Sequence, residues 1–201
     1  MGDAAGAPLE FDYQPSMEEA KHAMTMPGGD GVWGVASGQI TDDSELALCL
    51  AQALGSHLDF NLEQIAQNYA KWIDSPPFDI GFTTRASLGC LREPKWRSVC
   101  EAEGYAVAMT RAARQRCMES KSNGSLMRIA IQETLHGGGD TDTNACIVGG
   151  LIGAACGASA IPDEMKLAVL HCDTHQGKHP RPSFLHTTQV PELTKRLLGL
   201  S

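Results

Sequence analysis

The stretch HGGGDTDTNACIVGGLIGA, residues 136–154, joins a glycine-rich turn to an apolar run through two aspartates one residue apart. Such close carboxylates repel each other, so water or a cation must offset the repulsion. A cap for the following helix accounts for one of Asp140 and Asp142, but hardly for both. The apolar run from Ala145 to Ser159 is predicted to be a helix, and its glycines at 149, 153 and 157 would let another helix approach closely.

The composition favours close-packed helices in one domain, residues 1–201. Aromatic residues make up only 5%, whereas Gly, Ala, Leu and Met are plentiful. The net charge of -8 argues against a nucleic-acid surface but suits a site for divalent cations. Seven cysteines without a C-x-x-C pair favour reduced thiols and a cytoplasmic setting. The sequence shows no positively charged segment followed by an apolar one, as a signal peptide would have, and its longest apolar run is barely long enough to cross a bilayer. We therefore expect no membrane-spanning helix.

Helical periodicity recurs along most of the chain, and no strand pattern persists, so the predicted class is all-α. Capping residues and apolar spacing predict helices at 41–57, 62–73, 83–91, 101–119, from 162 onward and at 193–200. Residues 12–39 are predicted to be a loop, and SNGS at 122–125 a turn. Glu45, three residues after Asp42, suggests a capping box.

A second acidic cluster, Thr41-Asp42-Asp43, also stands where a helix begins. Alone it is most simply a helix cap with acid in the first turn. Facing Asp140-Thr141-Asp142-Thr143, however, it would complete a set of four carboxylates with hydroxyl oxygens. Oxygen ligands of this kind suit Mg²⁺, Mn²⁺ or Ca²⁺ rather than zinc, and four negative charges suit two metal ions.

Three other features have both a functional and a simpler interpretation. The region from His171 to His179 holds zinc-type ligands, but Gly177 and Pro180 favour a solvated loop. The SNGS turn could offer N–H groups to phosphate, although such turns are common. Glu10 follows GDAAGAPL, and a lone glutamate there is usually a surface residue.

Together these motifs resemble the ADP-ribosylglycohydrolase family. The resemblance rests on five segments: GDAAGAPLEF (2–11), GQITDDSELAL (38–48), DIGFTTR (79–85), SNGSLMRIA (122–130) and GGDTDTNACIVGGLIGA (138–154). It implies an orthogonal bundle of helices with a binuclear magnesium or manganese site. The substrates it implies are ADP-ribosylated proteins or small molecules that contain ADP-ribose.

The resemblance also implies roles for individual residues. Its metal ligands would be Thr41, Asp42, Asp43, Asp140, Asp142 and Thr143. Its catalytic residues would be Glu10, which would handle a proton near the scissile bond, with Asp43 and Asp142. Its substrate-binding residues would be Asp79, suited to an arginine-linked ADP-ribose, and a loop that cradles ADP-ribose: Asn123, Gly124, Ser125 and Met127.

The sequence departs from the family pattern between about 130 and 137. Only IAIQETLH separates Arg128 from Gly137, where the family has several helices, so the bundle is expected to be incomplete. Exposed apolar surface left by missing helices would favour association of copies. Two hypotheses follow: a metal-dependent hydrolase of ADP-ribosyl bonds, and a non-catalytic homologue that binds ADP-ribose or metal without turnover.

Overall fold

All regular structure in the described residues is helical, which confirms the predicted all-α class. The computed structural model describes residues 1–29, 31–56, 61–89, 123–175 and 177–200. Its α-helices are α1 (Gly2–Gly6), α2 (Met17–Ala23), α3 (Asp42–Ser56), α4 (Leu62–Ile73), α5 (Phe82–Gly89), α7 (Asn123–His136), α8 (Thr141–Cys156), α9 (Asp163–Leu170) and α10 (Val190–Leu197). Short 3₁₀ turns lie at Ala7–Leu9, Ala158–Ala160, Ser183–Leu185 and Thr187–Gln189.

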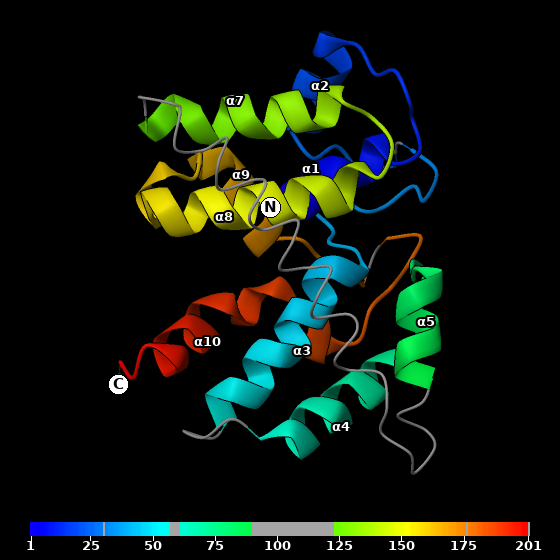
Figure 1. The fold of residues 1–201 in the computed structure, drawn as a ribbon, viewed down its shortest axis with the longest axis vertical. Helices are drawn as coiled ribbons and strands as arrows, with labels where there is room; N and C mark the ends of the chain where they lie inside the picture. The colour runs from blue at the N-terminus through cyan, green and yellow to red at the C-terminus, as the bar shows by residue number, and fades with distance from the viewer. Residues whose placement is uncertain (30, 57–60, 90–122, 176, 201) are drawn as a thin grey trace.

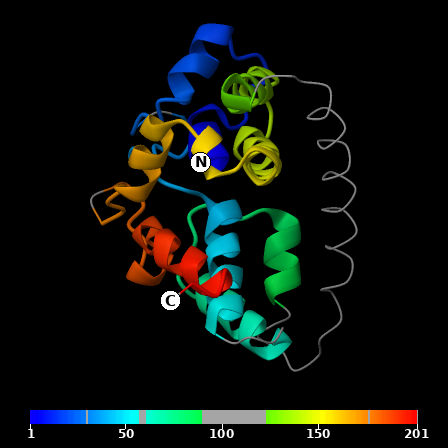
Figure 2. The ribbon, with the colours of Figure 1, turned by 90° about the vertical axis from the view of Figure 1, so that its left-hand side faces the viewer.

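The helices form two neighbouring groups (Figures 1 and 2). Helices α1, α2, α7, α8 and α9 make up one group, and α3, α4, α5 and α10 the other. Helices α7 and α8 lie side by side and are joined by the glycine turn at 137–139 (Figure 1). In that turn Gly138 and Gly139 adopt φ of 68° and 78°, which side chains rarely tolerate, so the three glycines let the chain turn directly into α8.

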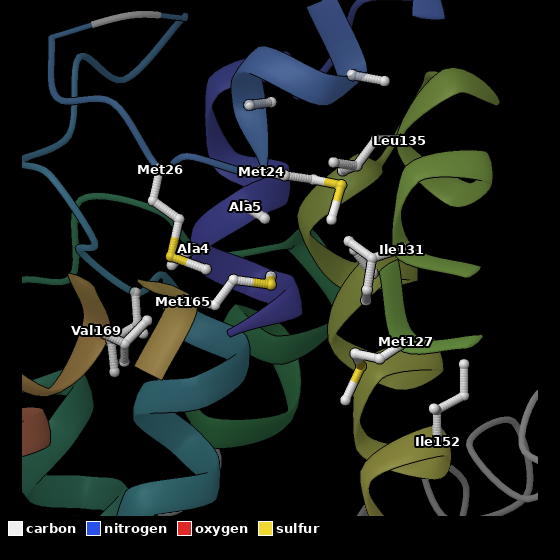
Figure 3. Close-up of a cluster of buried hydrophobic side chains, with 14 of the residues drawn as sticks. Ala4, Ala5, Met24, Met26, Met127, Ile131, Leu135, Ile152, Met165 and Val169 are labelled. Atoms are coloured by element: carbon white, nitrogen blue, oxygen red, sulfur yellow. The ribbon is translucent and has the colours of Figure 1, made fainter. Parts of the chain in front are cut away.

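The larger hydrophobic core lies mainly in the first group and reaches Leu48 of α3 and Leu193 of α10 (Figure 3). It is made of small residues from α1, sulfur-containing side chains and the facing aliphatic residues of α7 and α8: Ala4, Ala5, Met24, Met26, Met127, Ile131, Leu135, Ile152 and Met165. A smaller cluster of Cys49, Trp72 and Leu185 packs α3 against α4. The four cysteines that the structure describes, Cys49, Cys146, Cys156 and Cys172, are free thiols. None of the described helices is long and apolar enough to cross a bilayer.

Several predicted elements are confirmed, and others shift. The helices at 62–73 and after Pro162 are present, whereas the C-terminal helix spans Val190–Leu197 instead of 193–200. The helix predicted at 83–91 is present as α5, Phe82–Gly89, and the one at 101–119 lies outside the described residues. The apolar run begins its helix at Thr141, four residues earlier than predicted. Asp142 therefore lies in the first turn of α8.

Two predictions about loops are wrong. Residues 17–23 form α2 within the predicted loop, because Ser16 and Glu19 build a capping box that the loop interpretation overlooked. The residues of the predicted SNGS turn from Asn123 on belong to α7, which continues through IAIQETLH to His136. The short connection before the acidic motif is thus a helix that packs against α8.

Candidate metal centre

Helix α1 holds the starts of α3 and α8 together. Its Asp3 is completely buried and accepts hydrogen bonds from Thr41 N at 3.0 Å and from Ser44 N at 3.0 Å. Its Gly6 carbonyl accepts a hydrogen bond from Thr141 Oγ1 at 2.8 Å. One short helix therefore contacts both acidic clusters, although about 100 residues separate them in the sequence.

The approach of α1 to α8 depends on glycines in α1 rather than in α8. A Cβ atom on Gly2 would lie 1.8 Å from the Ala145 carbonyl oxygen, and one on Gly6 would lie 2.3 Å from Asp142 Cα. Among the α8 glycines predicted to allow close packing, Gly149 does so, because a Cβ atom there would lie 3.1 Å from Ile131 Cδ1. No side chain larger than hydrogen fits at Gly2 or Gly6 without moving the acidic start of α8.

The carboxylates gather into two groups that share Asp142. Oxygens of Asp42, Asp43 and Asp142 lie within 4.8 Å of one another, and so do oxygens of Glu10, Asp79 and Asp142. Thr41 Oγ1 donates to Asp3 Oδ1 at 2.8 Å and lies 3.1 Å from Asp142 Oδ2. The structure thus brings the two sequence clusters face to face.

Burial raises the pKa values of these carboxyls, and neighbouring carboxylates raise them further. The pKa of Asp43 rises to about 7 through burial and the charges of Asp3 and Asp42. The pKa of Asp142 rises to about 9 through burial, then through Glu10 and Asp3. The pKa of Asp79 rises to about 8, again mainly through burial. Without a cation, the cluster therefore favours protonated carboxyls.

Glu10 is buried rather than at the surface, and Trp33 holds it. The indole Nε1 of Trp33 donates to Glu10 Oε2. Burial raises the pKa of Glu10 to about 6, although the Trp33 hydrogen bond opposes this shift. Trp33 in turn packs edge-on against Phe78, which stacks on His179 with ring centroids 4.5 Å apart.

The donor set fits a hard divalent cation. It consists of carboxylate and hydroxyl oxygens, which Mg²⁺ and Mn²⁺ prefer. Asp43 Oδ2 is buried and has no hydrogen-bond partner in the described part of the chain. A buried acceptor without a donor is costly, and a cation would satisfy it and offset the raised pKa values. The residues of this cluster could hold a metal.

The remaining predicted site residues lie in different surroundings. Asp140 is exposed at the position before α8, and it helps to raise the pKa of Asp142. Thr143 is half-buried, its backbone N–H donates to Asp142 Oδ1 at 2.9 Å, and its side chain lowers the pKa of Asp43. Met127 packs in the hydrophobic core. Residues 123–125 begin α7, and their side chains lie outside the described set.

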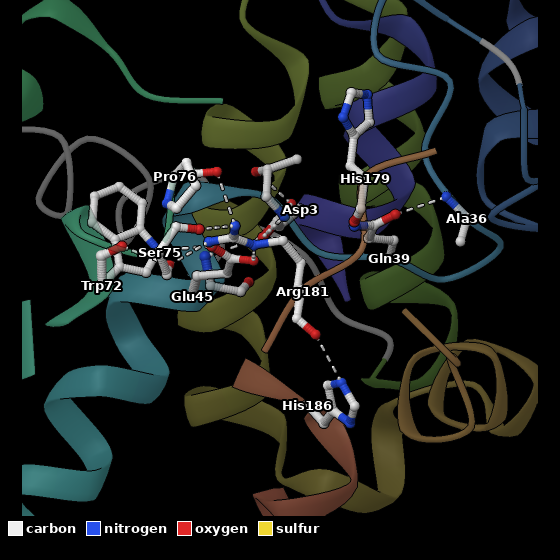
Figure 4. Close-up of polar contacts among 12 residues, drawn as sticks. Asp3, Ala36, Gln39, Glu45, Trp72, Ser75, Pro76, His179, Arg181 and His186 are labelled. Atoms are coloured by element: carbon white, nitrogen blue, oxygen red, sulfur yellow. Dashed lines mark hydrogen bonds and ion pairs between the residues drawn. The ribbon is translucent and has the colours of Figure 1, made fainter. Parts of the chain in front are cut away.

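The capping box predicted at the start of α3 is wrong, because Glu45 serves a different purpose (Figure 4). Its buried carboxylate accepts hydrogen bonds from Arg181 Nε at 2.7 Å and from Trp72 Nε1 at 2.7 Å. Arg181 Nη1 also donates to the carbonyls of Ser75 and Pro76, just before Asp79. This network fixes α3 relative to the loop that carries Asp79.

Sequence reasoning missed Asp3 and Arg181, which position the cluster. The Gly2-Asp3 pair was recognised as part of a motif, but the sequence did not indicate which residues Asp3 contacts. Arg181 lies among prolines and histidines, where no local sequence pattern indicates a role. In the alternative zinc region, His179 instead contacts the Trp33 carbonyl at 2.7 Å. The possible metal-binding groups found among the described residues are the two that share Asp142.

The architecture defines a class: an all-helical protein in which two helix starts face each other across a buried carboxylate cluster. The sequence profile of the ADP-ribosylglycohydrolase family matches residues 1–136 and 130–200. The chain therefore belongs to the ADP-ribosylglycohydrolase family. The two matches meet in the second half of α7, where the sequence departs from the family pattern.

Several named relatives are similar over part of the chain. A protein of Acanthamoeba polyphaga mimivirus, provisionally named ADP-ribosyl glycohydrolase L543, is 32% identical over 64% of the chain and 36% of its own length. The ADP-ribosyl-[dinitrogen reductase] glycohydrolase of Rhodospirillum rubrum is 32% identical over 44% of the chain and 30% of its own length. The ADP-ribosylarginine hydrolase Tri1 of Pseudomonas putida (strain GB-1) is 37% identical over 46% of the chain and 26% of its own length. The chain thus matches about a third of the length of these relatives.

Proposed function

We propose that the protein is a metal-dependent hydrolase that cleaves the glycosidic bond between ADP-ribose and a protein side chain or small acceptor. The observation that carries the proposal is the sharing of Asp142 by two groups of three carboxylates. Family membership and the names of the relatives agree with it. A cytoplasmic setting is part of the proposal and is supported by the free thiols.

The proposed metal ligands come from the two helix starts. They are Thr41, Asp42, Asp43, Asp140, Asp142 and Thr143. Two Mg²⁺ ions, or Mn²⁺ in their place, would supply Lewis-acid polarisation of a substrate oxygen or water. Asp43 and Asp142 are proposed to orient this centre, and Asp142 is held there by hydrogen bonds from Thr143 N and Thr41 Oγ1.

Glu10 and Asp79 are proposed to act on the substrate. A carboxyl with a pKa of about 6 can accept or donate a proton near neutral pH, and Trp33 keeps its Oε2 in place. Asp79 lies within 4.8 Å of Glu10 and Asp142, on the loop braced by Arg181. A carboxylate there suits a guanidinium leaving group, so we propose arginine-linked ADP-ribose as the preferred substrate.

The part of the chain from Asn123 to Met127 is proposed to contact ADP-ribose. We also propose that residues 1–201 form one domain that lacks family helices between about 130 and 137, which the meeting of the two profile matches supports. The shortness of the segment between Arg128 and Gly137, where the family has several helices, favours a second candidate function, a homologue that binds metal or ADP-ribose without turnover. Association of copies could supply missing surface, and it stays a prediction.

The experiment is a metal titration followed by a turnover assay on the full chain. Isothermal titration measures MgCl₂ binding to folded, monodisperse protein, and then ADP-ribose binding with and without Mg²⁺. Release of free ADP-ribose is measured from an ADP-ribosylarginine protein and an ADP-ribosylserine peptide. Asp142→Asn is the test variant, and Asp163→Asn, an exposed aspartate paired with Lys166, is the matched control.

The expected result is Mg²⁺ binding and Mg²⁺-dependent release of ADP-ribose, both lost in Asp142→Asn and kept in Asp163→Asn. Binding of metal without release would overturn the hydrolase in favour of the non-catalytic homologue. A folded wild-type sample that binds no divalent cation would overturn both. Faster release from the serine-linked substrate would contradict the role given to Asp79.

A further inference from the structure

Both carboxylate oxygens of Asp3 accept hydrogen bonds from residues at the start of α3. Oδ1 accepts from Thr41 N at 3.0 Å and from Thr41 Oγ1 at 2.8 Å, and Oδ2 accepts from Ser44 N at 3.0 Å. The side chain is 0% exposed. Both oxygens are thus bound to the start of α3, and Asp3 belongs to neither of the two carboxylate groups that share Asp142.

These contacts amount to a helix cap supplied by a distant segment. The first N–H groups of a helix have no partner within the helix, and they are usually capped by the residue just before it. Here the carboxylate comes from α1, 38 residues away in the sequence from Thr41. A charged acceptor on backbone N–H groups makes stronger hydrogen bonds than a neutral one, so it fixes the first turn more firmly.

The start of α3, which Asp3 caps, carries three of the proposed metal ligands: Thr41, Asp42 and Asp43. The Thr41 hydroxyl points to Asp3 Oδ1, and its oxygen lies 3.1 Å from Asp142 Oδ2. Asp42 and Asp43 stand between the two residues whose N–H groups Asp3 binds. The backbone and the Thr41 rotamer are therefore both set before a cation arrives.

Helix α1 links this cap to the other half. Gly2 and Gly6 bring α1 against Ala145 and Asp142, and Gly6 accepts the Thr141 hydrogen bond. A displacement of Asp3 would therefore move the start of α3 relative to the start of α8.

We propose that Asp3 is a positioning residue that preorganises Thr41, Asp42 and Asp43 for the cation, without itself being a ligand. The proposal rests on the proposed metal centre and goes beyond it in assigning this residue. Loss of a partner that orients metal ligands typically weakens metal binding by about 10- to 100-fold. The same loss is expected for Asp3→Asn, because the amide can accept at only one of its two ends.

The test compares metal binding with metal-free stability. Isothermal titration with MgCl₂ and thermal unfolding with and without MgCl₂ are measured for wild type, Asp3→Asn and the control Asp163→Asn. Asp3→Asn should bind Mg²⁺ about 10- to 100-fold more weakly and lose most of the Mg²⁺-induced rise in Tm. A residue that only supports the fold would lower the Tm equally with and without Mg²⁺ and leave the Mg²⁺-induced rise unchanged.

Two outcomes separate this proposal from the function on which it rests. If wild type binds no cation, the metal centre itself is wrong. If wild type and folded Asp3→Asn bind Mg²⁺ equally, the role of Asp3 is wrong and the centre stands. Should Asp3→Asn not fold, amide hydrogen exchange of wild type decides: slow exchange of Thr41 and Ser44 without Mg²⁺ supports preorganisation, and exchange slowed only by Mg²⁺ overturns it.

Discussion

Replacement of Arg181 by methionine tests the network that braces the cluster. Arg181 forms a buried ion pair with Glu45 at 2.7 Å, with the two side chains 3% and 2% exposed. It also donates to the carbonyls of Ser75 at 2.7 Å and Pro76 at 3.1 Å. Arg181→Met keeps most of the apolar volume and removes all of these donors.

The expected loss is large because Glu45 would remain buried without its cation. Removing one partner of a buried ion pair typically lowers the free energy of unfolding by about 3–5 kcal/mol. That is a large share of the roughly 5–15 kcal/mol that holds a domain folded. Burial raises the pKa of Glu45, and the Arg181 charge opposes that rise. Without Arg181 the pKa rises further, so the deficit should shrink as the pH falls and Glu45 takes up a proton.

The assay is urea unfolding of the metal-free protein, followed by circular dichroism at pH 5 and pH 8. Arg196→Met is the matched control, because its ion pair with Glu192 is exposed and should contribute only about 0.3–0.5 kcal/mol. Adding Glu45→Gln to Arg181→Met should restore part of the loss, since no buried charge then remains. Equal losses for Arg181→Met and Arg196→Met, or a deficit independent of pH, would refute the reasoning.

Two further predictions concern the cluster itself. The pKa of Asp43 is raised to about 7, of Asp79 to about 8 and of Asp142 to about 9, so their stabilising contribution is complete below about pH 4. This contribution to the free energy of unfolding is lost as the pH rises from there through those pKa values, and the loss is on the order of 4 kcal/mol for Asp43 alone. Urea unfolding of the metal-free protein should show this loss of stability, and saturating Mg²⁺ should remove it. Gly6→Ala places a Cβ 2.3 Å from Asp142 Cα and should weaken both Mg²⁺ binding and stability. Gly150→Ala, which meets nothing within 4 Å, should raise stability by up to about 1 kcal/mol, and equal Tm values for the two variants would contradict the close packing of α1.

Local sequence patterns predicted the helices that they encode by themselves. The 62–73 helix has apolar residues at helical spacing, an Asn61 cap and a following Ser-Pro-Pro, and it appears with the predicted bounds. Helix α2 was missed although Ser16 and Glu19 carry the signature of a capping box, because the surrounding glycines and prolines suggested a loop. In both places the deciding interactions join residues close together in the chain.

The role of Glu45 could not be predicted in this way. Its spacing from Asp42 is that of a capping box, but a bidentate contact with Arg181, 136 residues later, is available only in the folded chain. Local sequence patterns also could not predict which of the two aspartates, Asp140 or Asp142, would be buried. Because α8 begins at Thr141, Asp142 is buried against α1, and Asp140 stays exposed before the first turn.

The sequence by itself determined the helical class and the presence of acidic, hydroxyl-rich clusters at two helix starts, since periodicity and capping are local properties. The sequence also supplied the negatively charged carboxylates that suit the binding of a divalent cation there. Only the tertiary structure decided that the clusters meet, that Asp3 caps α3 from another helix and that Arg181 braces the Asp79 loop. Each of those contacts joins residues more than 35 positions apart. The first two follow from the contacts of α1 with the starts of α3 and α8, and the third follows from the contact of Arg181 with Glu45 of α3 and with the Ser75 carbonyl.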